Sequence, residues 1–198
     1  MTEISTTTVE SIATGTERYV IDNRSNRFTV RAFATGLLAA MGHDPTLGIR
    51  DFSGVVEFNP EKLEASFLRI VVKSSSLSVQ DDISAKDFHE MECFMSQEVL
   101  ETATYPEIFY ESHSVSLTKT DDMFYSGTLK GNLTLHSVAR SLPINVRVAL
   151  LGSLLRASGD FSLNQTDYVI KLVSVPGGAL KLKDELKFSF EIVARREE

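Results

Sequence analysis

Apolar and polar residues alternate along most of the chain, as they do in strands that bury only one face. The alternation is clearest over residues 27–33, 52–59, 128–136, 144–150 and 187–194. In the first of these segments Phe28, Val30 and Ala32 share one face. Further strands are predicted at 65–73, 107–117, 159–163 and 168–174. The pattern therefore predicts an all-β chain of about eight or more strands, each apolar on one side.

One interval, residues 84–100, departs from this alternation. Its apolar residues Phe88, Met91, Met95 and Val99 follow one another at steps of three and four, which places them on one face of a helix. Ser84 stands three positions before Asp87, a plausible start signal for a helix. We therefore predict a single helical segment near residues 84–100.

Antiparallel strands with one apolar face have to cover that face. They do so by stacking as a sandwich or by closing into a barrel. A barrel of about eight strands is either filled by its own side chains or holds one apolar ligand. The helical segment is suited to closing a barrel mouth, and it is equally able to pack on the outside. The alternation by itself leaves these outcomes open.

The composition fits a single domain with a tail. The chain has 198 residues, 42% of them hydrophobic and 24% charged. Residues 1–18 are polar and are predicted to form a flexible arm, and residues 19–195 are predicted to form the domain. The formal net charge of −7 argues against a nucleic-acid partner and against an anionic membrane surface, because both require clustered Lys and Arg.

Cysteine content and the N-terminus restrict the compartment. Cys93 is the one cysteine, so an internal disulfide and a thiolate metal cluster are excluded. No stretch approaches the roughly 18 consecutive apolar residues of a transmembrane segment. Residues 1–18 lack the basic start and the apolar core of a signal peptide. We therefore expect a cytoplasmic protein if Met1 is the native start, and a periplasmic one if residues are missing before it.

The segment Gly42-His43-Asp44-Pro45 is the main candidate for chemistry. A metal-dependent enzyme would use His43 with His89 and a carboxylate, although no two histidines have the short spacing of common zinc motifs. A nucleophile elbow and a glycine-rich phosphate loop are both absent from the sequence. Gly, Asp and Pro together are also typical of a tight connection. A third reading, compatible with the second, is a polar rim that grips the headgroup of an apolar ligand.

Several segments, taken in order, resemble the YceI-like family of lipid- or polyisoprenoid-binding proteins. The resemblance lies in Tyr19–Asp22, Phe28-x-Val30, Gly42–Leu47, Phe52-x-Gly54-x-Val56-x-Phe58-Asn59-Pro60, Ser76–Val79, Asp87-x-His89, Val99–Glu101, Tyr105–Ser112, Gly127–His136 and Gly178–Asp184. The similarity covers residues 20–195. It implies an antiparallel, lipocalin-like barrel whose tunnel accommodates a long prenyl chain, with no catalytic role established for the family in general. It also implies that many relatives are exported to the periplasm.

On this reading the chain is a non-enzymatic carrier or sequestering protein for an isoprenoid-type lipid, such as a polyprenyl group or a quinone tail, and it needs no cofactor. The residues that we expect to contact the ligand are Phe28, Val30, Leu133, Leu135, Phe161, Phe188, Phe190 and Ile192 in the tunnel, Phe88 and Met91 at one end, and His43 and His89 at the mouth. The alternatives are the metal-dependent enzyme and a ligand-free stress-response interaction module with a solid barrel. A homodimer is plausible.

Overall fold

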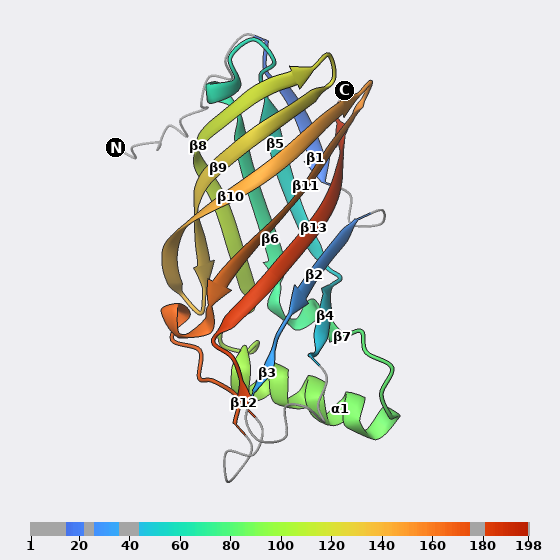
Figure 1. The fold of residues 1–198 in the computed structure, drawn as a ribbon, viewed down its shortest axis with the longest axis vertical. Helices are drawn as coiled ribbons and strands as arrows, with labels where there is room; N and C mark the ends of the chain where they lie inside the picture. Colours follow the sequence, from blue (N-terminus) through green and yellow to red (C-terminus); the bar gives the residue numbers. More distant parts are fainter. Residues whose placement is uncertain (1–14, 22–25, 36–43, 175–180, 198) are drawn as a thin grey trace, which may run out of the picture.

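The structure is a computed structural model that describes residues 15–21, 26–35, 44–174 and 181–197. Its main feature is a closed antiparallel barrel of eight strands (Figure 1). In the order of pairing these are β1 (Glu17–Ile21), β5 (Phe52–Phe58), β6 (Phe67–Lys73), β8 (Glu107–Asp121), β9 (Phe124–Leu135), β10 (Val138–Leu151), β11 (Leu154–Asn164) and β13 (Glu185–Arg196). The pairing of β1 with β13 closes the ring, with Tyr19 opposite Arg196.

Shorter elements gather toward one end of the barrel. β2 (Arg27–Arg31) pairs with β13 and is followed outward by β4 (Thr46–Ile49) and β7 (Leu77–Val79). β3 (Ala34–Thr35) and β12 (Lys181–Leu182) form a separate two-stranded ladder. Figure 1 shows this ladder and α1 (Ala85–Phe94) at the same end, which we call the helical end. The opposite end, which carries the β8–β9 and β10–β11 turns, is the turn end.

The alternation in sequence explains the barrel wall. Along β10, Leu142, Ile144, Val146 and Val148 are buried, and the residues between them are exposed. Successive side chains of a strand point to opposite faces, so the apolar set of each strand turns inward when the sheet closes. The predicted all-β, lipocalin-like barrel with one helical segment is confirmed.

The helical segment begins where the sequence predicts. The Ser84 hydroxyl accepts a hydrogen bond from the Asp87 amide at 3.1 Å, and the same hydroxyl donates to the Asp87 carboxylate at 2.7 Å. This exchange fixes the first turn of α1. After Phe94 the chain continues as a π-helical turn, Met95–Val99. None of the helices in the described part of the chain has the length and apolar character that spanning a membrane requires.

The predicted strand over residues 168–174 is wrong. Gln165–Tyr168 forms a 3-10 turn, and Val169 follows with a φ of +61°, which breaks an extended backbone. Asp184 holds this turn, because its carboxylate accepts hydrogen bonds from the amide and the hydroxyl of Thr166. Only Ser174 forms a bridge, with Lys181. The arm predicted for residues 1–18 lies mostly outside the described residues.

Candidate functional site

The inward side chains leave an elongated space inside the barrel. The cavity has a volume of about 320 Å³. Inward-facing residues of all eight barrel strands line it, together with residues of the helical segment. β10 spans 14 residues, which at about 3.3 Å per residue and a tilt of about 40° gives a barrel roughly 35 Å tall. Lining residues occur from Val148 near the turn end to Leu182 at the helical end. A small volume spread over that height is narrow, and it suits one chain-like occupant.

The two ends of the cavity differ in packing. Near the turn end Tyr19, Phe58 and Leu155 are among the most buried side chains of the described residues, and the Phe58 and Tyr125 rings meet edge to face at 5.2 Å. At the helical end the lining residues Met91, Met95, Val173 and Leu182 are only half-buried. An occupant would therefore enter more easily from the helical end.

Four phenylalanines narrow the cavity between β2, β11 and β13. Phe161 and Phe188, partners in the β11–β13 register, stack with ring centroids 4.6 Å apart. Phe28 meets Phe188 edge to face at 6.4 Å, and Phe190 lies 5.9 Å from Phe28. Such pairs are more rigid than aliphatic contacts and offer flat apolar faces to a ligand.

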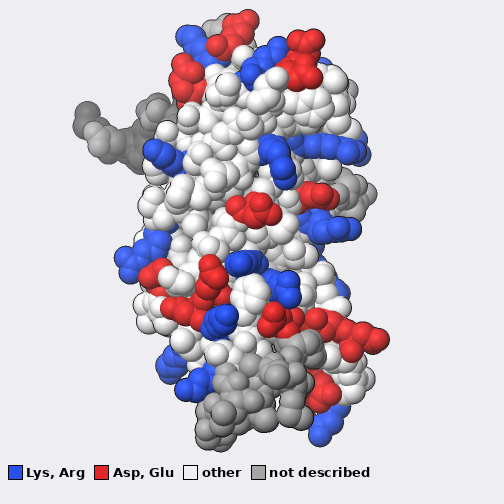
Figure 2. Space-filling model, in the orientation of Figure 1, with Lys and Arg blue, Asp and Glu red and all other residues white. Residues whose placement is uncertain are grey.

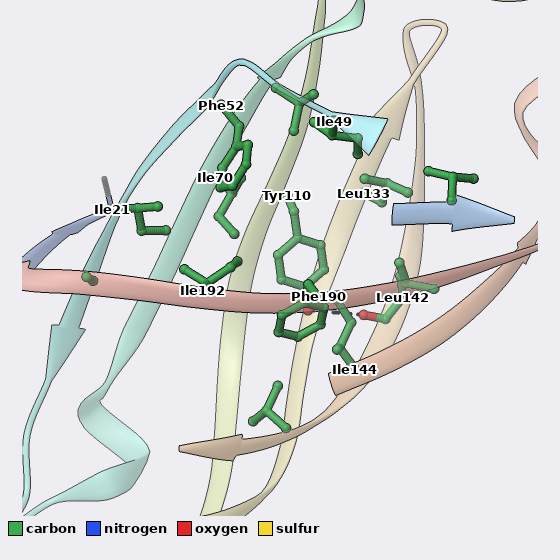
Figure 3. Close-up of a cluster of buried hydrophobic side chains, with 14 of the residues drawn as sticks. Ile21, Ile49, Phe52, Ile70, Tyr110, Leu133, Leu142, Ile144, Phe190 and Ile192 are labelled. Carbon is green, nitrogen blue, oxygen red and sulfur yellow. Dashed lines mark hydrogen bonds between the residues drawn. The ribbon is translucent and has the colours of Figure 1, made fainter. Parts of the chain in front are cut away.

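The polar side chains in the lining are already hydrogen-bonded. The Ser66 hydroxyl accepts from the Asn59 amide at 3.1 Å, and the Gln165 side-chain amide donates to the Lys183 carbonyl at 2.9 Å. The Tyr110 hydroxyl donates to the Leu142 carbonyl at 3.1 Å. Figure 3 shows this bond among apolar side chains that point inward from several strands. No charged side chain lines the cavity among the described residues, so its interior favours an apolar occupant.

Burial of Tyr110 gives the barrel a pH dependence that we expect to be measurable. Burial raises the pKa of the Tyr110 phenol from 10.0 to about 12. The folded state thus holds this proton more tightly than the unfolded state. The contribution of the protonated phenol to the free energy of unfolding is therefore complete below about pH 10 and is lost as the pH rises toward about 12. In urea unfolding at several pH values, Tyr110→Phe should lose less stability than the wild type across that window. At pH 7 the variant should be less stable by about 1 kcal/mol, because the Leu142 carbonyl loses its donor.

An equally steep alkaline loss in wild type and Tyr110→Phe would assign the effect to other groups. Tyr168 is a useful comparison, because burial also raises the pKa of its phenol, and the negative charge of Asp167 adds to that shift. A Tyr168→Phe variant therefore separates a general tyrosine effect from one specific to the barrel interior.

The structure brings together nine of the twelve residues that the sequence suggested as ligand contacts. These lining residues are Phe28, Val30, Met91, Leu133, Leu135, Phe161, Phe188, Phe190 and Ile192. Phe88 and His89 lie on α1 and are not part of the lining, because the helical segment turns Met91, Phe94, Met95 and Val99 toward the cavity instead. His43 lies outside the described residues. Contact of any of these residues with a ligand stays a prediction.

The Asp44 carboxylate serves the connection before β4. It accepts a hydrogen bond from the Ala34 amide at 3.0 Å and pairs with the Arg31 guanidinium at 3.2 Å. These contacts agree with the tight-connection reading of the sequence. His89 lies near the Cys93 thiol, with its Nε2 3.7 Å from Sγ. Within the described residues, no three His, Cys, Asp or Glu side chains come together in a way that could hold a metal ion.

The sequence reasoning missed part of the lining. Ile70, Val72 and Tyr110 face the cavity from β6 and β8, and Met95, Val99 and Leu100 face it from the helical segment and its exit. The alternation could have identified the strand residues, because they stand at the alternating apolar positions of the predicted strands 65–73 and 107–117. For the helical residues, the step of three and four identified the face but not the element that it covers.

A family model described as "YceI-like domain" matches residues 19–194. A UPF0312 protein of Pseudomonas savastanoi pv. phaseolicola is 30% identical over 189 residues, which cover 90% of this chain and 87% of that protein. A UPF0312 protein of Azotobacter vinelandii is 29% identical over 130 residues, or 65% of this chain and 60% of the relative.

Solved structures show the same fold at lower identity. Burkholderia cenocepacia BcnA has a TM-score of 0.65 and 16% identity, with 87% of this chain and 98% of that chain covered. A polyisoprenoid binding domain from Saccharophagus degradans, implicated in plant cell wall breakdown, has a TM-score of 0.65 and 15% identity over 90% of this chain and 98% of that chain. At these identities the likeness establishes the fold.

Proposed function

The chain belongs to the YceI-like family, and on that premise we propose that it binds one long apolar chain of an isoprenoid-type lipid inside the barrel. The chain would be a polyprenyl group or the tail of a quinone. The protein would carry or sequester this lipid without changing it chemically. The polyisoprenoid binding domain from Saccharophagus degradans has the same fold, which supports this class of ligand.

The observation that carries the proposal is an elongated cavity without a charged lining residue among those described. Each buried methylene contributes about 0.8 kcal/mol, so burial of about fifteen carbons gives on the order of ten kcal/mol before ordering costs. Because the polar lining groups are already paired, little specificity arises inside the cavity. Chain length and cross-section would then select the ligand.

Neither alternative is favoured by the geometry. An interaction module with a solid barrel is at odds with the cavity of about 320 Å³. A metal-dependent enzyme would need His43, outside the described residues, to join His89, which is exposed on α1 away from the lining. No observation on the described residues draws these groups together.

The experiment is extraction and rebinding with the full chain. Organic extraction of purified protein followed by mass spectrometry should release a lipid with an isoprenoid chain. The protein contains no Trp, so rebinding is best followed with an environment-sensitive apolar dye. Farnesol and longer prenols should displace the dye from delipidated protein, and glycerol should not. If no prenol displaces the dye and extraction releases no apolar molecule, the proposal is wrong.

A further inference from the structure

Three cations surround one aromatic ring on the outer surface of the helical end. The Arg31 guanidinium carbon and the Lys187 ammonium each lie 5.4 Å from the centroid of the Phe33 ring, and the Lys183 ammonium lies 5.9 Å from it. Arg31 and Lys187 face each other across the β2–β13 pair. Only Arg31 has an acidic partner, Asp44; the described residues place no carboxylate within ion-pair distance of Lys183 or Lys187.

This cluster lies at the rim of the cavity. Phe33 directly follows Ala32, and Lys183 directly follows Leu182, and both Ala32 and Leu182 line the cavity. The Lys183 amide donates a hydrogen bond to the Phe33 carbonyl at 2.8 Å, which holds the two backbones together. Side chains of neighbouring residues in extended segments point to opposite faces. The lining residues therefore point inward, and the aromatic ring and the cations lie just outside.

Exposed apolar side chains continue the cluster along the next segment. The Leu182 amide donates to the Val173 carbonyl at 3.0 Å, so residues 172–174 lie beside β12. Leu172 is 43% exposed and Val169 is 71% exposed. Val169 also has a φ of +61°, an unfavourable backbone conformation for a β-branched residue. Lys171 stands between Val169 and Leu172 in the sequence. This backbone presents an apolar side chain to solvent although burial would stabilise it.

The cluster at the rim of the cavity is positively charged, whereas the net charge of the chain is negative. We call Arg31, Phe33, Leu172, Lys181, Lys183 and Lys187 the basic rim. Two acids near it are engaged, Asp44 with Arg31 and the Ala34 amide, and Asp184 with Thr166; Glu185, between Lys183 and Lys187 in sequence, is exposed. The helical segment, in contrast, carries Asp87, Glu90 and Glu98 at exposed positions. Figure 2 shows Lys and Arg side chains over the whole height of one face, with acidic side chains between and beside them in its lower half.

We propose that the basic rim docks on the surface of a bilayer that contains anionic lipids. Lys and Arg stems would lie along the Phe33 and Leu172 side chains with their charged ends at the lipid phosphates, as amphipathic side chains do at membrane interfaces. A cluster of four or more Lys and Arg attracts an anionic surface at about 1 kcal/mol each. The helical end of the cavity, where the lining residues are half-buried, then lies at the bilayer. Loading of a lipid from there rests on the proposed function; the docking does not.

The net charge of −7 speaks against such a partner only if the charges are spread evenly. Screening limits electrostatic interaction to about 10 Å at 0.1 M salt, so acids at the turn end have little effect on a contact at the helical end. Residues 31–33 of the basic rim are distant in sequence from residues 172–187, and the two stretches become neighbours only in the folded barrel.

Vesicle flotation of the full chain tests the docking. Vesicles of phosphatidylcholine alone should bind weakly, and vesicles that also contain phosphatidylglycerol should bind the protein, with binding reduced by added salt. The double variant Lys183→Gln/Lys187→Gln should lose about thirtyfold in affinity for the anionic vesicles. The matched control, Arg156→Gln/Arg195→Gln, removes two exposed cations from the turn end and should change little. Leu172→Ser should weaken the binding that remains at high salt.

Equal binding to both kinds of vesicle, or equal loss in the two double variants, would overturn the docking at this rim. Displacement of the apolar dye by farnesol, measured without vesicles, should be the same in Lys183→Gln/Lys187→Gln and in the wild type. If farnesol binds and the anionic vesicles do not, only the docking is wrong. If the vesicles bind and farnesol does not, only the proposed function is wrong. Thermal unfolding of each variant confirms that all are folded.

Discussion

The Ala157→Phe variant is expected to bind a long prenol about a thousandfold more weakly than the wild type, while binding of farnesol changes little. Ala157 lines the cavity from β11, opposite Val148 in the β10–β11 register, in the part nearer the turn end. A phenyl ring there would occupy space that the alanine leaves open. Excluding one isoprene unit of about five carbons costs about 4 kcal/mol at 0.8 kcal/mol for each carbon, which corresponds to three orders of magnitude in affinity.

Chain length separates this effect from unfolding. Dye displacement is measured with prenols of increasing length, and the wild type should gain affinity with each unit until the cavity is full. Ala157→Phe should stop gaining at a shorter chain. The matched control is Arg156→Phe, which adds the same ring at an exposed position of the same strand. An unchanged affinity for every prenol in Ala157→Phe would show that the chain does not reach this part of the barrel.

The strands and the identity of much of the lining could be predicted because both depend on local parity. Phe28, Phe188 and Phe190 fall on the inward side of their segments, and the structure turns them into the cavity. Closure of the barrel could not be predicted in this way. It depends on the pairing of β1 with β13, at opposite ends of the chain, and period-two alternation is the same in a sandwich and in a barrel.

Two features of the helical end were hidden for a different reason. Residues 168–174 have the apolar content of a strand, and the turn that replaces it depends on the Asp184 carboxylate, which reaches Thr166 from another segment. The basic rim could not be predicted from the sequence, because the net charge is an average over the whole chain. Arg31 comes close to Lys183 and Lys187 only through β-sheet pairing in the folded state. Similarly, whether inward side chains fill a barrel depends on the side-chain volumes relative to the barrel diameter. A pattern of apolar positions does not specify that diameter.

The Gly127→Ala variant is expected to lower the free energy of unfolding by about 3 kcal/mol, a large fraction of the 5–15 kcal/mol typical of a domain. Gly127 lies in β9, where β8 approaches closely. A Cβ at this position would lie 1.9 Å from the Ser116 carbonyl oxygen and 2.8 Å from the Leu117 Cα. Both atoms belong to the backbone of β8, so rotation of a side chain cannot relieve the overlap, and the two strands would have to separate.

Gly54 and Gly159 show the same relation to the carbonyl oxygens of neighbouring strands, at 2.4 Å each, so close backbone approach is a general property of this strongly curved wall. Urea unfolding followed by circular dichroism should give a lower midpoint for Gly127→Ala with an unchanged slope. The control is Gly152→Asn in the β10–β11 turn, where a Cβ meets nothing within 4 Å and a φ of +63° suits asparagine. It should stay within about 1 kcal/mol of the wild type. A Gly127→Ala midpoint equal to that of the wild type would mean that β8 and β9 can separate there at little cost. The width of the cavity would then not be fixed by the backbone.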